Sequence, residues 1–196
     1  MLDDLSHYLT RLSQHYLMVY HIYKNVGQKD RGLSHLERAV QLDPGNTGYL
    51  EALGVHFVSS RQYSRALAVY QRARRIDPDQ PMFAANIGRM HTRLRQYGPA
   101  EQVYQQIVRE HPNNGLGYVE LVRLYLKTQR NLPRTVGLAR KAVALQPHAT
   151  NYHLLCWALD VNGHYPEALQ AIQKALALAP HHGTYQKLHE IIMQKM

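Results

Sequence analysis

The chain has 196 residues, of which 45% are hydrophobic, so it carries enough apolar side chain to bury the core of one domain or one short repeat array. Its formal net charge of +9 favours acidic partners, whether a peptide, a nucleic acid or an anionic surface. A single cysteine excludes an internal disulfide framework and a zinc site built from several thiolates, and no apolar run is long enough to predict a membrane span.

The first predicted element is one long helix over residues 2–26, a stretch without glycine before its end and without proline. Its apolar residues alternate spacings of three and four, which places them on one stripe of an α-helix. The stripe consists of Leu2, Leu5, Leu9, Leu12, Tyr16, Val19 and Tyr23. We expect the part from Tyr16 onward to belong to the core of a helical hairpin.

The first four leucines of this stripe have no preceding helix to cover them, and such a stripe left in water is an interaction surface or a liability. We expect Leu2, Leu5, Leu9 and Leu12 to be an oligomer interface in residues 1–12. The segment would pack against the same segment of a second copy to give a homodimer, or against upstream sequence that this chain lacks. The third alternative is a simple cap that folds back over the first repeat.

From residue 13 onward the sequence repeats with a period of about 34 residues, which is marked by a proline near the end of each repeat. These prolines are Pro44, Pro78, Pro112, Pro147 and Pro180. Small residues precede four of them by twelve positions and would let two helices approach closely. They are Gly32, Ala66, Ala100 and Ala168, with Thr135 as the exception. The predicted repeats span 13–46, 47–80, 81–114, 115–148 and 149–182, and the fourth carries one extra residue.

Local turn chemistry predicts two helices in each repeat. Pro99, Pro133 and Pro166 stand where the second helix of a repeat should begin, and there a missing N–H costs nothing. Gly27 and Gly163 fall near the ends of first helices, where a left-handed closing residue is needed. After the last proline, an apolar stripe over residues 183–196 predicts an amphipathic capping helix.

The repeat pattern resembles that of the tetratricopeptide repeat family. The second repeat, for example, reads Leu50, Leu53, Gly54, Phe57, Ala66, Tyr70, Ala73 and Pro78. The resemblance implies an all-α fold, a right-handed α-solenoid of about five helix-turn-helix repeats with a C-terminal capping helix. It also implies a protein-protein interaction scaffold, not an enzyme, that binds a peptide segment in a groove lined by the first helices of the repeats.

Alignment with the family gives a set of candidate groove residues. They are His21 and Lys24 in repeat one, Arg89 and Arg93 in repeat three, Val119, Arg123, Leu126 and Lys127 in repeat four, and His153 and Trp157 in repeat five. Arg89 and Arg123 are one repeat apart, as are Arg93 and Lys127, so we expect a cationic ladder. Guanidinium groups grip carboxylates in a bidentate fork, which favours an acidic and hydrophobic peptide.

Other functions have weaker signals. Arg72, Arg74 and Arg75 form the densest basic cluster, which leaves nucleic acid or another anion as the alternative ligand, although nucleic acid is the less favoured partner. The adjacent His181 and His182 would point apart, and no cysteine or carboxylate stands beside them at ligand spacing, so we expect no metal site. Neither a catalytic motif nor a cofactor-binding motif is present. We expect a soluble chain, and the compartment stays open with the cytoplasm slightly favoured.

Overall fold

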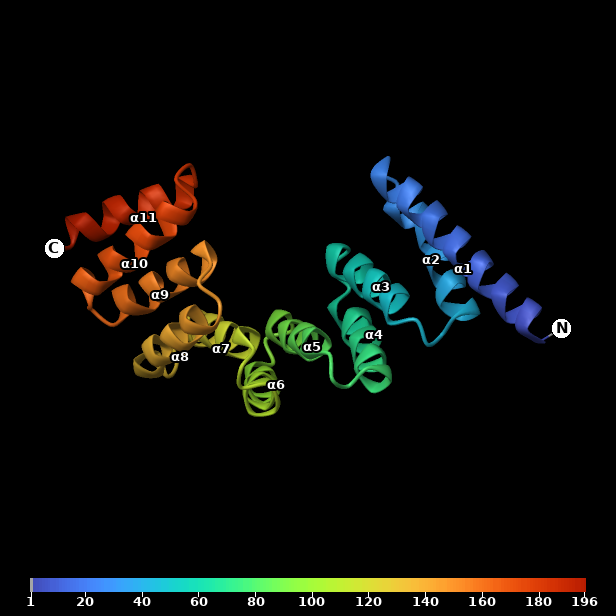
Figure 1. Cartoon of the computed structure of the whole chain (residues 1–196), viewed down its shortest axis with the longest axis horizontal. Helices are drawn as coiled ribbons and strands as arrows, with labels where there is room; N and C mark the ends of the chain where they lie inside the picture. Colours follow the sequence, from blue (N-terminus) through green and yellow to red (C-terminus); the bar gives the residue numbers. More distant parts are fainter. Residues whose placement is uncertain (1) are drawn as a thin grey trace. The chain divides into compact units, whose positions relative to one another are not determined.

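The computed structural model describes residues 2–196, with side chains from residue 5 onward. This part of the chain forms eleven α-helices and no β-strand (Figure 1). The helices are α1 (Leu2–Asn25), α2 (Lys29–Leu42), α3 (Thr47–Ser59), α4 (Tyr63–Ile76), α5 (Pro81–Arg93), α6 (Tyr97–Glu110), α7 (Gly115–Thr128), α8 (Leu132–Leu145), α9 (Ala149–Val161), α10 (Tyr165–Leu178) and α11 (Gly183–Gln194). The all-α fold class expected from the sequence is confirmed.

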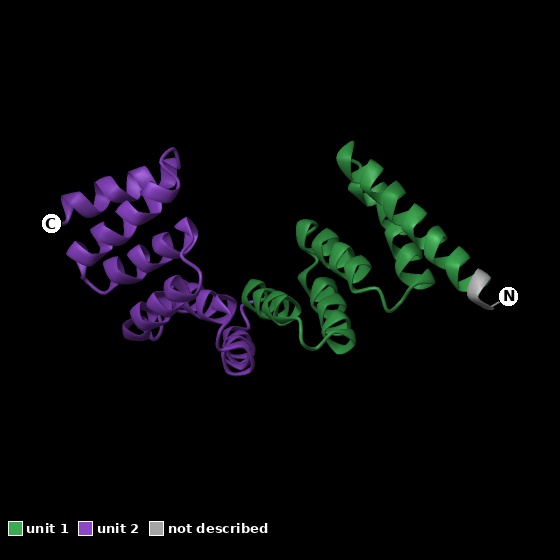
Figure 2. Ribbon diagram, viewed as in Figure 1, with its two compact units in different colours: residues 1–94 green, residues 95–196 purple. Residues whose placement is uncertain are grey.

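The chain divides into two compact units, residues 1–94 and residues 95–196 (Figure 2). In the first unit each helix from α1 to α5 packs against the next one along the chain. In the second unit the same holds from α6 to α11, and α7 also contacts α9. Within a unit, therefore, each helix covers the apolar side of a neighbour that could not bury that side alone.

Small residues stand where helices cross most closely. Ala66, Ala100 and Ala168 are fully buried, as is Thr135 at the same place in the fourth repeat. The hydroxyl of Thr135 donates to the carbonyl of Leu132 at 2.5 Å, and Asn162 donates its amide to the same hydroxyl at 3.2 Å. The polar exception in the sequence pattern is therefore tolerated because its buried hydroxyl is hydrogen-bonded on both sides.

In every hairpin turn, the residue at the same position of the repeat has a left-handed backbone conformation. The positions are Gly27, Arg61, Arg95, Gln129 and Gly163, which follow one another at the repeat period and all have φ between 56° and 80°. Only the two glycines adopt this conformation without strain, because a side chain clashes with the backbone there. The repeat therefore imposes one turn geometry on residues that do not favour it.

Candidate interaction surfaces

An exposed patch on α7 and α9 carries four of the predicted groove residues. Arg123 and Lys127 lie one turn apart on α7, and both are exposed. Trp157 on α9 is 41% exposed, and His153 one turn before it is half-buried. The guanidinium of Arg123 lies 3.5 Å from the carboxylate of the buried Glu120. We refer to Arg123, Lys127, His153 and Trp157 as the α7–α9 patch.

His153 is held in place by ring stacking. Its ring stacks on that of Tyr185 in α11, with 5.1 Å between the ring centroids. The ring of His182 stacks on the same tyrosine with 3.8 Å between the centroids. Burial lowers the pKa of His153, and the nearby His182 and Arg123 lower it further. The imidazole therefore stays neutral near pH 7, and the positive charge of the patch comes from Arg123 and Lys127.

Two other predicted groove residues lie inside the second unit. Val119 and Leu126 on α7 pack with Leu154 and Ala158 of α9, and Leu126 is only 1% exposed. In this arrangement their side chains contribute to the core between α7, α8 and α9. The exposed apolar side chain of the α7–α9 patch is therefore Trp157, and contact of the two aliphatic residues with a ligand stays a prediction.

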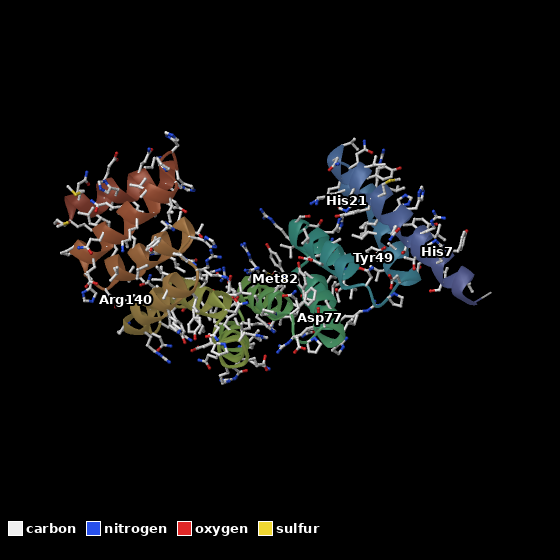
Figure 3. The ribbon with its side chains drawn as sticks, in the orientation of Figure 1. His7, His21, Tyr49, Asp77, Met82 and Arg140 are labelled. Atoms are coloured by element: carbon white, nitrogen blue, oxygen red, sulfur yellow. The ribbon has the colours of Figure 1, made fainter. Side chains whose placement is uncertain are left out.

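The remaining groove residues belong to the first unit. His21 and Lys24 are exposed near the end of α1, and His21 is labelled in Figure 3. On α5, Arg93 is exposed, while Arg89 is half-buried and donates to the side-chain oxygen of Asn86 at 2.9 Å. Because α5 and α7 belong to different units, the cationic ladder stays a prediction from the sequence.

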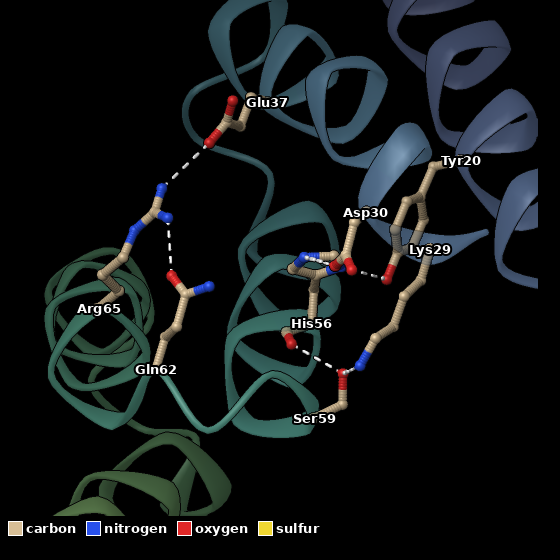
Figure 4. Close-up of polar contacts among 8 residues, drawn as sticks. All are labelled: Tyr20, Lys29, Asp30, Glu37, His56, Ser59, Gln62 and Arg65. Atoms are coloured by element: carbon tan, nitrogen blue, oxygen red, sulfur yellow. Dashed lines mark hydrogen bonds and ion pairs between the residues drawn. The ribbon is translucent and has the colours of Figure 1, made fainter. Parts of the chain in front are cut away.

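The first unit contains a buried polar cluster that the sequence did not predict. His56 on α3 is 1% exposed, and its Nδ1 lies 3.4 Å from the hydroxyl of Tyr20 on α1 (Figure 4). Its Nε2 has no hydrogen-bond partner and lies 3.7 Å from the carboxylate of Asp30 on α2. Burial lowers the pKa of His56 more than Asp30 raises it, so the ring is neutral at pH 7.

Helix α1 carries an exposed apolar stripe that differs in part from the predicted one. Leu5 is exposed, whereas Leu9 and Leu12 are half-buried; Leu2 lies outside the residues whose side chains are described. The other exposed apolar residues are Tyr8, Met18, Ile22 and Val26. At about 100° per residue, Leu5, Tyr8, Met18 and Ile22 fall within one side of α1, and Val26 follows directly after the helix. The opposite side carries Ser13 and Tyr20, which bond to residues of α3. We call Leu5, Tyr8, Met18 and Ile22 the α1 stripe.

Other chemistry is limited in the described part of the chain. Among residues 2–196, no group of three or more histidine, cysteine or acidic side chains is arranged to hold a metal ion. No helix there is long and apolar enough to cross a membrane. Cys156 is fully buried in the core of the second unit, and burial raises the pKa of its thiol to about 12. The thiol is therefore inert.

The sequence matches models of a known protein family. Models described as tetratricopeptide repeat match residues 21–81, 52–115 and 149–182. The chain belongs to the tetratricopeptide repeat family. The matches include the end of α1, all of α2 through α6, and the hairpin of α9 and α10. Tetratricopeptide repeat (TPR) proteins generally serve as scaffolds for protein-protein interactions. No curated protein matches the sequence of this TPR chain.

Solved structures of TPR proteins share the fold of this chain. A thermophilic TPR protein of Thermus thermophilus is 18% identical with a TM-score of 0.73, and the match covers 93% of this chain and 99% of that one. The pilF protein of Pseudomonas aeruginosa is 16% identical with a TM-score of 0.74, covering 95% and 85% of the two chains. YrrB, described as a TPR protein with an unusual peptide-binding site, is 17% identical with a TM-score of 0.62, covering 91% and 90%. At these identities the likeness concerns the fold.

Proposed function

We propose that this TPR protein is a non-catalytic scaffold that binds an acidic and hydrophobic peptide segment on the α7–α9 patch. The observation that carries the proposal is an exposed indole on α9 and two exposed cations on α7, two first helices that contact each other. Aromatic side chains and arginines supply most of the energy at protein interfaces. A carboxylate of the partner would pair with Arg123 or Lys127, while an apolar side chain would cover Trp157. The peptide-binding site named for YrrB supports this class of ligand by analogy.

Peptide binding tests the proposal. A fluorescent peptide array that varies acidic and aromatic content selects a ligand, and fluorescence anisotropy then gives its affinity. We expect Arg123→Gln and Trp157→Ala each to weaken binding by about tenfold, because each removes on the order of 1.4 kcal/mol or more. Arg130→Gln is the matched control, since Arg130 is exposed in the same unit but outside the patch. Unchanged affinity in both patch variants, with native circular dichroism, would show that the peptide binds elsewhere.

We further propose that the α1 stripe joins two copies of the chain. Apolar side chains on one face of a 24-residue helix are typical of a helix that pairs with another helix. Charge favours the antiparallel orientation: the sequence places Asp3 and Asp4 in the first turn of α1 and Lys24 in its last turn. In an antiparallel pair these ends meet with opposite sign, whereas in a parallel pair like charges meet.

The same antiparallel register matches apolar positions. When Asp3 of one copy faces Lys24 of the other, Leu5 faces Ile22 and Tyr8 faces Val19. Across a two-fold axis, each copy would thus contribute the same four residues, Leu5, Tyr8, Val19 and Ile22, as an isologous interface requires. The capping helix α11 presents mainly polar residues to solvent, Gln186, Lys187, Glu190 and Gln194, together with the exposed apolar residues Ile191 and Met193.

Disulfide crosslinking tests both the pairing and its register. The double variant Leu5→Cys with Ile22→Cys should form an intermolecular disulfide on mild oxidation, while each single variant should not. The native Cys156 does not interfere because it is buried. Light scattering on the unmodified chain should give the mass of a dimer, and Ile22→Glu should give a monomer. Met193→Glu, an exposed apolar residue on α11, is the control. A monomeric unmodified chain at all concentrations would refute the pairing.

A further inference from the structure

Ion pairs link successive second helices on their exposed side. In the first unit, Glu37 of α2 pairs with Arg65 of α4 at 3.3 Å. In the second unit, Arg140 of α8 pairs with Glu167 of α10. Counted back from the proline of each repeat, the two pairs use the same two positions, with acid and base exchanged. An acid–base link at this place therefore occurs once in each unit, whereas the same two positions of α4 and α6 hold Gln71 and Pro99.

The link is missing between α6 and α8. The two positions are occupied there by Gln105 and Arg134, so the acid is replaced by a neutral amide. Among the described residues, Arg134 forms no ion pair, and neither does Arg109, which lies one turn after Gln105 on α6. Both guanidinium groups are exposed. Two positive charges thus remain without a carboxylate partner at this position.

A pocket of about 300 Å³ opens between α6, α7 and α8 at the missing link. Its apolar lining comes from Val108, Leu121, Leu138 and the ring of Tyr125. Gln105, Arg109 and Arg134 supply the polar lining. The corresponding pocket between α8 and α10, where Arg140 and Glu167 pair, measures only about 140 Å³. The larger pocket is at the lower end of the size range of small-ligand sites, which are apolar clefts with a few polar groups.

One carboxylate lies near this pocket, and it is already engaged. Glu101 accepts a hydrogen bond from the hydroxyl of Tyr125 at 2.6 Å and another from the amide of Gln105 at 3.1 Å. Burial and then this hydrogen bond raise the pKa of Tyr125, so its hydroxyl keeps its proton and remains a donor. With one carboxylate, Glu101, against the guanidinium groups of Arg109 and Arg134, the site retains a net positive charge.

From this geometry we propose that the pocket between α6 and α8 binds a carboxylate that carries a small apolar body. The carboxylate replaces the missing acid and pairs with Arg134 and Arg109, whose guanidinium groups suit bidentate contacts. The apolar body covers Leu121, Val108 and Leu138. The ligand is either a free carboxylic acid or the acidic end of a peptide, because both present the same chemistry. The site lies on α6, α7 and α8 and does not include any residue of the α7–α9 patch.

Binding of benzoate, followed through the amide resonances of the ¹⁵N-labelled chain, tests this site. Benzoate should shift the amides of residues 105–109 and 134–138 and those of Leu121 and Tyr125, and it should leave the amides of Lys127, His153 and Trp157 unchanged. Benzamide has the same shape without the charge, and it should bind at least about tenfold more weakly, since a charge-assisted pair contributes more than a neutral one. N-acetylphenylalanine and its amide repeat the comparison for a peptide terminus. Tighter binding of N-acetylphenylalanine than of benzoate indicates a peptide-borne carboxylate, and the reverse indicates a free acid.

Substitutions distinguish the contribution of the arginine charges to benzoate binding from that of the open pocket volume. Arg134→Gln and Arg109→Gln should each weaken benzoate binding about tenfold, and Leu138→Phe should block it by filling the pocket while both charges remain. Arg140→Gln removes an arginine from the neighbouring link and should leave benzoate affinity unchanged. Equal affinity for benzoate and benzamide, shifts at other amides, or full affinity in Arg134→Gln with native circular dichroism would each overturn the proposal.

Discussion

Gly54 on α3 lies directly against the ring of Tyr70 on α4. A Cβ atom added at Gly54 would lie 2.5 Å from Cε1 and Cζ of Tyr70, whereas carbon atoms in contact are normally about 3.5–4.0 Å apart. The ring cannot move aside freely because Tyr70 is 2% exposed. The substitution Gly54→Ala therefore forces the two helices apart by about 1 Å.

The cost follows from comparison with a second helical glycine. Gly137 on α8 has open space where its Cβ would stand, so Gly137→Ala should gain about 1 kcal/mol from helix propensity alone. Gly54→Ala gains the same amount but loses about 1–3 kcal/mol to overpacking. The free energy of unfolding of Gly54→Ala should therefore be lower than that of Gly137→Ala by about 1–3 kcal/mol.

Urea unfolding followed by circular dichroism measures this difference, and Tyr70→Leu identifies its source. In the native background Tyr70→Leu leaves a cavity and destabilises the protein, whereas combined with Gly54→Ala it also relieves the clash. We expect the double substitution to be less harmful than the sum of the single ones by at least about 1 kcal/mol. Additive effects, or equal stability of the two alanine variants, would refute the reasoning.

Three further results are expected. Arg61→Gly should stabilise the fold by about 0.5–1 kcal/mol in urea unfolding, because the left-handed turn strains a residue with a side chain; a loss of stability would contradict this. The lowered pKa of His56 means that the unfolded chain binds a proton more readily, so stability should fall as pH drops below 6.5, and His56→Phe should flatten that dependence. If the stability of the His56→Phe variant falls as steeply with decreasing pH as that of the native chain, His56 is not the source of this pH dependence. Cys156 should resist a thiol reagent in native protein at pH 8 and react after unfolding, because its pKa is about 12.

The sequence predicted the hairpins because their signals are local. Proline at the end of each repeat and glycine at the ends of first helices constrain backbone angles directly, and Gly27 and Gly163 do adopt the left-handed conformation. Arg61 and Arg95 adopt it as well, but nothing in their chemistry favours it. Their conformation is imposed by packing of the two flanking helices, which only the three-dimensional structure reveals.

The surfaces were harder to predict because exposure depends on neighbouring helices. A period of three and four places Leu9 and Met18 on a helix, but it does not say which side the next hairpin covers; Leu9 is half-buried and Met18 is exposed. Leu126 illustrates the same limit, since the family alignment does not reveal that its side chain packs in the core, and its contact with a ligand stays a prediction. The pocket beside Arg134 was not predicted at all, because its origin is the absence of a partner in another repeat.

The opposite polarity of the two ion pairs restricts how hairpins can stack. Repeats share their shape, so during folding a hairpin can meet the wrong neighbour, a characteristic failure of repeat proteins. If α4 met α8, Arg65 would face Arg140, and if α10 met α2, Glu167 would face Glu37. Like charges raise the energy of both mismatched arrangements, whereas each native neighbour brings opposite charges together. The exchanged acid and base therefore act against misassembly, and so they contribute to the uniqueness of the fold more than their exposed positions contribute to its stability.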